Sequence, residues 1–251
     1  MSGRLDALKS SSERLRAIAE ALHGDQLTAP SYASEWNIAD VFSHLGSGAV
    51  LMLARVEAGV AGTELAADVA PPVWDEWNAK SPEAKARDAL VADRALVDRF
   101  DAFTAAGRAA FHITFGPMQL DFDGLVGLRL NEHAVHTWDI AVMLDPTATV
   151  PADAAALILD SLGLIAGFVG KPSGTERALH VRTTGPTRDF ELVLGAERVS
   201  LEPCAADHTA DLELPAEAFV RLVYGRLDPD HTPPVRGTAD LDELRRAFPG
   251  L

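Results

Sequence analysis

The chain has 251 residues, 47% of them apolar, and carries a formal net charge of −15. The acidic surplus removes the attraction on which binding to nucleic acids and anionic lipids depends, so we expect neither a nucleic acid nor a membrane as partner. The single cysteine, Cys204, excludes an intramolecular disulfide. Because we find neither a secretory signal nor an apolar run of bilayer-spanning length, we expect a cytoplasmic protein.

The first half of the sequence predicts a bundle of four helices. Apolar residues recur at helical spacing, and Asn37 and Ser81 stand where helix caps are expected. Residues 59–81, which contain Pro71 and Pro72, are expected to form a loop. The predicted helices cover residues 3–23, a stretch from Ile38, residues 82–103 and residues 122–144.

The second half has a different pattern, which predicts a small α+β domain with an antiparallel sheet. A proline-containing polar stretch places the domain boundary near residue 150, so that the domains are 1–150 and 151–251. Three segments alternate apolar and polar residues as half-buried strands do, and two later segments have helical spacing. The expected strands cover 178–184, 189–195 and 211–215, and the expected helices 216–225 and 238–248.

The candidate chemistry lies on the helix over residues 122–144. Glu132 and His136 are four residues apart, so their side chains share one helix face and can hold one ion. This face also carries apolar residues, so we expect the pair to point into the bundle core. His44, on the helix that starts at Ile38, is the third candidate. A plain Glu–His pair, or a buried ion pair of Glu132 with Arg129, explains the same pattern.

Two further features of these residues bear on the kind of site. Gly46 and Gly48 lie close to His44 within a predicted helix, which suggests that another backbone or a ligand approaches there. Two histidines and one glutamate would leave coordination positions open, as in catalytic zinc sites. Zinc is the first expectation for the metal, although nickel, iron and manganese accept the same donor atoms.

The segments WNIADVFSHL, VWDEWNAKSPE and LRLNEHAVHTWDIAV resemble the N-terminal domain of the mycothiol-dependent maleylpyruvate isomerase family, a branch of the DinB-like four-helix proteins. Residues from about 178 to 246 resemble that family's C-terminal domain, which is related to sterol carrier proteins. The most specific part is the string R-x-x-E-x-x-x-H-x-x-D. Carried over residue by residue, the family's metal ligands fall on His44, Glu132 and His136.

The resemblance also suggests roles for four other residues. Trp36 and Arg129 are candidate cofactor-binding residues, although Trp36 has the alternative of packing at the start of its helix. Asp139 is a candidate catalytic residue that would orient a ligand, and Arg226 is one that would bind a carboxylate or else pair with Asp228. His133 points about 100° away from Glu132 around the helix and is not expected to take part.

The implied function is that of a metal-dependent enzyme with mycothiol as thiol cofactor or co-substrate. Addition of a thiolate to a cis-enoyl substrate, rotation and elimination would give cis-trans isomerisation, and irreversible addition would make the protein a thiol S-transferase. An excess of arginine over lysine is typical of actinobacteria, which use mycothiol. Alternatives are a metal-dependent hydrolase without thiol and a non-catalytic small-molecule or lipid-binding protein. A monomer or homodimer that acts on a small electrophile is expected.

Overall fold

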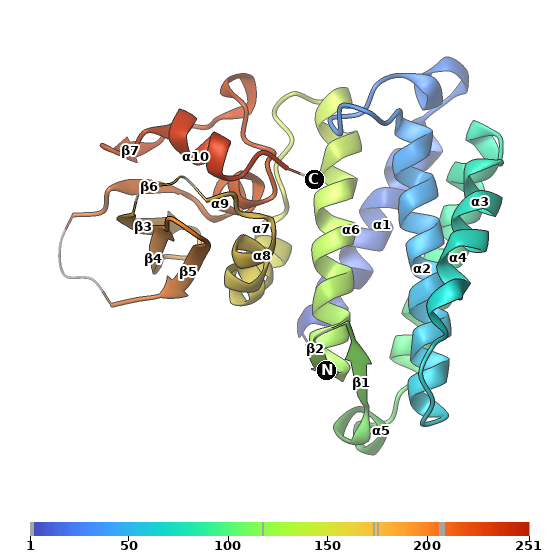
Figure 1. The fold of residues 1–251 in the computed structure, drawn as a ribbon. Coiled ribbons are helices and arrows are strands. Elements are labelled where there is room, and N and C mark those ends of the chain that lie inside the picture. Colours follow the sequence, from blue (N-terminus) through green and yellow to red (C-terminus); the bar gives the residue numbers. More distant parts are fainter. Residues whose placement is uncertain (1–2, 117, 173, 175, 206–208, 251) are drawn as a thin grey trace. The chain divides into compact units, whose positions relative to one another are not determined.

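The computed structural model describes residues 3–116, 118–172, 174, 176–205 and 209–250, and it divides into two compact units, Met1–Asp145 and Pro146–Leu251 (Figure 1). The first unit is helical and the second contains a five-stranded sheet. The fold is thus of the α+β class, with a helical bundle followed by a smaller α+β unit, as the sequence predicted.

Four long helices build the first unit, and all four were predicted from apolar spacing. They are α1 (Gly3–Ala21), α2 (Ile38–Val60), α4 (Pro82–Asp101) and α6 (Phe122–Leu144). Large side chains from several elements meet between them, among them Phe42 and Leu45 of α2 and Ile140 of α6. This shared core fixes α2 beside α6, the two helices that carry the candidate ligands.

Both predicted caps are present. The side chain of Asn37 accepts a hydrogen bond from the backbone N–H of Asp40 at 2.8 Å, and the Asp40 carboxylate accepts one from the N–H of Asn37 at 3.2 Å. Ser81 accepts from the N–H of Ala84 at 3.3 Å at the start of α4. The two caps satisfy backbone donors that have no partner inside their helices, and they set where α2 and α4 begin.

The expectation of a loop over residues 59–81 was wrong. The segment contains a 3-10 turn (Ala67–Val69) and the helix α3 (Ala70–Asn78). Pro71 and Pro72 lie in the first turn of α3, where proline gives up no helical hydrogen bond. Also unexpected were a short helix, α5 (Ala105–Ala110), and an antiparallel hairpin of β1 (His112–Phe115) and β2 (Met118–Asp121) before α6.

The sheet of the second unit contains the three predicted strands and two that were not predicted. Its order is β5-β4-β3-β6-β7. The strands are β3 (Arg177–Thr184), β4 (Arg188–Leu194), β5 (Val199–Pro203), β6 (Leu212–Pro215) and β7 (Arg236–Gly237). The sheet is not wholly antiparallel, because β6 pairs with β3 in parallel.

Helices α9 (Ala216–Val223) and α10 (Leu241–Ala247) were predicted. Among the described residues, one stretch, Ala152–Val169, has the length and apolar composition of a membrane span, contrary to our expectation that none exists. The stretch is not one straight helix, since it comprises α7 (Ala152–Ile158), a 3-10 turn and α8 (Leu162–Val169). Ile158 and Leu162 are fully buried, whereas Leu164 and Phe168 are exposed.

Candidate metal centre

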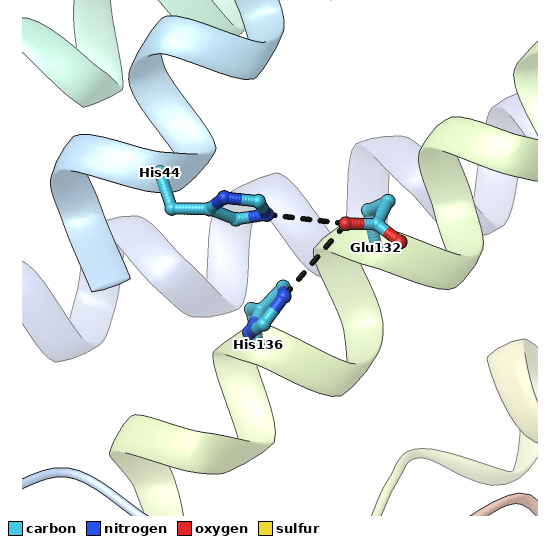
Figure 2. Close-up of side chains that lie close together, drawn as sticks. All are labelled: His44, Glu132 and His136. Carbon is cyan, nitrogen blue, oxygen red and sulfur yellow. Dashed lines mark hydrogen bonds and ion pairs between the residues drawn. The ribbon is translucent and has the colours of Figure 1, made fainter. Parts of the chain in front are cut away.

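The structure brings His44, Glu132 and His136 together, although 88 residues separate the first two. His44 comes from α2 and the other two from successive turns of α6 (Figure 2). The Nε2 atom of His44 lies 3.1 Å from Oε2 of Glu132, and Nε2 of His136 lies 3.7 Å from the same oxygen. One ligand atom from each residue lies within 4.8 Å of the other two, a spacing that could hold a metal ion.

The cluster is more open than its apolar helix face suggested. The side chains of His44 and Glu132 are 38% and 47% exposed, while that of His136 is 12% exposed. The expectation that the pair points into the bundle core therefore holds for His136 and was wrong for Glu132. Met143, on the same predicted stripe, is also 45% exposed. An open site is consistent with a ligand that arrives from solvent.

The carboxylate of Glu132 stays ionised well below neutral pH. Burial raises the pKa of this group, but the hydrogen bond with His44 and the charges of His136, His44 and Arg129 outweigh it and lower the pKa to about 2. Burial lowers the pKa of His136 against the opposing effect of Asp139. An ionised carboxylate is the protonation state that a cation requires of this ligand.

Asp139 lies in contact with His136. Its Oδ2 atom lies 2.8 Å from Nδ1 of His136, and the carboxylate is fully buried. The backbone carbonyl of Asp139 accepts a hydrogen bond from the N–H of Tyr32 at 3.0 Å, so the segment before α2 packs onto this turn of α6. With Nδ1 directed at a carboxylate, Nε2 of His136 faces Glu132 and His44. Carboxylate–histidine pairs of this kind commonly support metal ligands in proteins.

Arg129 lies behind the cluster. Its guanidinium is 3% exposed, and Nη2 donates to Oδ1 of Asp93 and to the backbone carbonyl of Leu45, each at 3.0 Å. The hydrogen-bonded partners of Arg129 are thus Asp93 and the helix next to His44. The hypothesis that it makes an ion pair with Glu132 in place of a metal receives no support from these contacts.

His133 has a structural position, as its direction on the helix indicated. It is fully buried, with Nδ1 2.8 Å from the hydroxyl of Ser11 and Nε2 3.3 Å from Oδ2 of Asp93. Asp93 thereby joins α4 to two residues of α6. Asp93 was missed from the sequence because nothing in the α4 pattern separates a buried aspartate from the exposed acids around it.

The two glycines beside His44 accommodate neighbouring side chains. A Cβ atom at Gly46 would come within 2.2 Å of the Trp77 ring, and one at Gly48 would lie 3.3 Å from Nη1 of Arg129. The expected close approach is real, but in this structure the groups that approach are an indole ring and a guanidinium. Both contacts pack α2 tightly against its surroundings around His44.

Trp36 lies against both histidines. Its ring centroid is 5.0 Å from that of His44 and 5.8 Å from that of His136. It also lines a pocket of about 410 Å³ on the α2 and α3 side of the cluster. The pocket is lined by Trp36, Asp40, Ser43, His44, Ser47, Trp74 and Asn78. Trp74 and Asn78 were not predicted as neighbours of His44 because they lie on α3, which was expected to be a loop.

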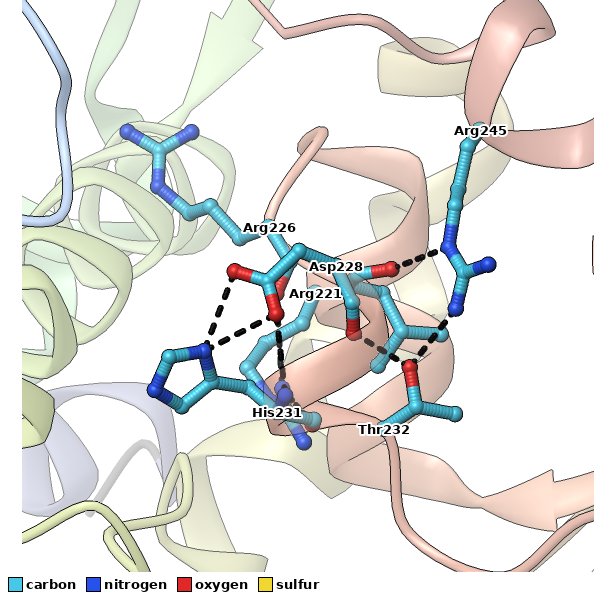
Figure 3. A network of polar contacts seen from close by, with 7 residues as sticks. Arg221, Arg226, Asp228, His231, Thr232 and Arg245 are labelled. Atoms are coloured by element: carbon cyan, nitrogen blue, oxygen red, sulfur yellow. Dashed lines mark hydrogen bonds and ion pairs between the residues drawn. The ribbon is translucent and has the colours of Figure 1, made fainter. Parts of the chain in front are cut away.

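Arg226 belongs to the second unit and follows α9. Its Nη1 atom donates to the carbonyl of Tyr224 at 2.7 Å. Asp228 accepts from the ring Nδ1 of His231 at 2.9 Å and from the backbone N–H of His231 at 2.9 Å (Figure 3). Arg221 donates to the carbonyl of His231 at 2.8 Å and so fixes the same turn. These contacts define the loop after α9.

Comparison with known protein families gives a match over residues 8–141, more than half of the chain, to the mycothiol maleylpyruvate isomerase N-terminal domain. The chain belongs to this family. No curated protein matches it. Among solved structures it is similar to a mycothiol-dependent maleylpyruvate isomerase and to a histidine-to-alanine mutant of that enzyme. Identities are 13% and 14%, with 89% of this chain and 88% of the other covered and a TM-score of 0.64 in both cases. At this identity the two structures establish the fold alone.

Proposed function

We propose that this member of the family is a metal-dependent enzyme that uses mycothiol as thiol cofactor or co-substrate, as a cis-trans isomerase of the maleylpyruvate type or as a mycothiol S-transferase. The observation that carries the proposal is the convergence of His44, Glu132 and His136 at one point of an open cluster. The protein would act in the cytoplasm on a small electrophile.

The three residues fit a divalent cation, with zinc the first expectation, by their chemistry and their surroundings. Two imidazole nitrogens and a carboxylate oxygen are zinc ligands, and three protein ligands leave a position for a substrate atom. When bound, such a cation lowers the pKa of a thiol so that thiolate is available at neutral pH.

The chain's own residues prepare this site. Asp139 holds the proton on Nδ1 of His136, which leaves the lone pair of Nε2 for the cation. The indole of Trp36 covers one side of both imidazoles and limits their motion. The positive charge of Arg129 lowers the pKa of Glu132, while its guanidinium donates hydrogen bonds to Leu45 and Asp93. Arg226 remains a candidate for binding a substrate carboxylate, because a guanidinium matches a carboxylate in geometry and charge.

The test is to measure bound metal in the purified protein and then to incubate the metal-loaded protein with mycothiol and either maleylpyruvate or a panel of electrophiles. About one metal per chain and a trans product with free thiol would indicate the isomerase, and a thiol adduct would indicate the transferase. Turnover without mycothiol would favour a hydrolase. A lipid that co-purifies with metal-free protein would favour a binding protein.

Variants connect the activity to the cluster. His44→Ala and His136→Ala should each lose most of the metal and of the turnover, because two ligands hold a cation far less tightly than three. His112→Ala is the matched control, since His112 is an exposed histidine of the same unit outside the cluster. Full retention of metal in His44→Ala and His136→Ala would contradict the proposal.

A further inference from the structure

The residues that line the pocket beside the candidate metal centre indicate the chemical class of a ligand, which the three candidate metal ligands alone do not. Its volume of about 410 Å³ falls within the range of small-molecule sites. His44 is one of its walls, so a ligand in the pocket would lie next to the candidate metal. The remaining wall residues come from the start of α2, the segment before it, and α3.

Two tryptophans give the pocket flat apolar surfaces. Trp36 lies over the histidines, and Trp74 contributes from α3 with 50% of its surface exposed. Trp77, three residues further on the same helix, is 4% exposed and packs at Gly46. Trp77 therefore already packs α3 into the core, and the exposed indole of Trp74 is not needed for that packing. Indole faces of this kind pack against the C–H faces of saturated rings.

The polar groups of the pocket are mostly neutral. The hydroxyl of Ser43 lies 3.4 Å from Oδ1 of Asn78, and the hydroxyl of Ser47 donates to the carbonyl of His44 at 3.2 Å. Asp40 is the acidic residue among those that line the pocket. Its Oδ1 atom lies 2.8 Å from Nζ of Lys85, which is not among the lining residues. These hydroxyl, amide and carboxylate groups can exchange hydrogen bonds with a ligand that carries several hydroxyls.

The same set of groups is unsuited to an acidic ligand. Among the described residues that line the pocket there is no lysine or arginine, and the carboxylate of Asp40 would repel a carboxylate ligand. A substrate such as maleylpyruvate, with two carboxylates, would thus have an unfavourable charge interaction here. A neutral polyhydroxylated ring has none.

We propose that the pocket lined by Trp36, Trp74 and Asn78 binds the glucosaminyl-inositol part of mycothiol and so directs the cysteinyl thiol to the edge of His44. The inference deepens the proposed function and rests on it. It assigns the ring-bearing part of the thiol to this pocket and leaves the electrophile to approach the cluster from another direction. Trp74 would thereby be a specificity residue for the thiol.

The experiment uses N-acetylglucosaminyl-inositol as the probe, in which an acetyl group replaces the acetylated cysteinyl group of mycothiol, so that the probe has no thiol and, like mycothiol, no free amine to pair with Asp40. Its binding to the full chain is measured by isothermal titration calorimetry, once with metal-loaded protein and once after treatment with a chelator. Because the pocket consists of protein groups alone, we expect binding in both states. Trp74→Ala and Asn78→Ala should each weaken binding about tenfold or more, since each loses a contact to the rings.

Glu76→Ala is the matched control, because Glu76 lies on the same helix with a side chain that is 71% exposed and is not part of the pocket wall. It should bind the probe as the unchanged chain does, and metal content should be equal in all variants. The proposal is overturned if the unchanged chain does not bind the probe at millimolar concentration. It is overturned equally if Trp74→Ala and Asn78→Ala bind the probe as tightly as the unchanged chain.

Failure of the proposed function has a different signature. In that case the unchanged chain would lack metal or thiol-dependent turnover, whatever the calorimetry gives for the probe. Where turnover is present, Trp74→Ala should raise KM for mycothiol and leave KM for the electrophile unchanged. The reverse pattern, a raised KM for the electrophile only, would assign the pocket to the electrophile and would also overturn the proposal.

Discussion

The guanidinium of Arg129 joins α6 to α2 through the backbone carbonyl of Leu45, 3.0 Å from Nη2. Leu45 follows His44 directly, and Arg129 precedes Glu132 by about one helical turn. The contact therefore fixes the position of His44 along its helix relative to Glu132 and His136. Asp93, also 3.0 Å from Nη2, balances the charge that this buried contact requires.

Replacement of Asp93 by asparagine should strongly destabilise the first unit. The change leaves the buried charge of Arg129 without its carboxylate, and breaking one side of a buried pair costs about 3–5 kcal/mol. Chemical denaturation monitored by circular dichroism measures the loss. Asp98→Asn is the matched control on the same helix, because the Asp98–Arg94 pair is exposed and its removal should leave the denaturation midpoint nearly unchanged. Equal midpoints for the two variants would count against the role given to Asp93.

Acid should remove the contribution of Asp93. Burial raises the pKa of this carboxyl, but His133, Arg129 and Ser12 more than compensate and hold the pKa far below its ordinary value. A group whose pKa is lowered by folding stabilises the folded state above its unfolded pKa and loses that effect as pH falls. We expect the free energy of unfolding to fall from about pH 4 downward. In Asp93→Asn this acid limb should be shallower, which denaturation between pH 2 and about pH 6 can measure. Parallel acid limbs would contradict it.

The sequence predicted the bundle well because its signals are local. Apolar spacing and the caps at Asn37 and Ser81 depend on residues a few positions apart, and the structure has α2 and α4 where these signals place them. Glu132 and His136 share a helix face for the same reason. His44 could be selected from its own helix and again from the resemblance, but its contact with Glu132 could not be predicted from spacing, because the spacing within one helix does not say which other helix lies beside it.

What the sequence did not reveal depends on neighbours distant in the chain. The exposure of Glu132, the burial of Asp93 and the pocket wall at Trp74 follow from how α2, α3, α4 and α6 meet. The prolines of α3 were misread because Pro71 and Pro72 favour both a loop and a helix start. The parallel pairing of β6 with β3 was missed because alternation along a strand carries no information about its direction.

Gly46→Ala should destabilise the first unit. The new Cβ would lie 2.2 Å from the buried ring of Trp77 and 3.0 Å from the backbone of Ala89, so α2 would have to move away from α3 and α4. Overpacking of this kind costs about 1–3 kcal/mol, more than alanine gains in helix propensity. Gly127→Ala is the control, because the nearest atoms there belong to the long side chain of Arg4. Thermal melts of both variants are the measurement, and an unchanged Tm for Gly46→Ala would contradict the packing described for α2.

Asp139→Asn tests whether the candidate centre depends on its supporting carboxylate. The amide has nearly the same shape, but it no longer offers a charged acceptor to Nδ1 of His136, 2.8 Å away. Loss of such a partner commonly weakens metal binding 10–100-fold. Competition with a chromophoric zinc chelator should therefore give a Kd about 10–100-fold higher than that of the unchanged chain.

Circular dichroism should show an intact helical unit, which separates weaker binding from misfolding. Asp123→Asn is the control: Asp123 is an acid of the same helix but lies in its first turn, so this change should leave the Kd unchanged. An unchanged Kd in Asp139→Asn would mean that the carboxylate does not act on the candidate centre through His136, since the backbone contact with Tyr32 is the same in both chains.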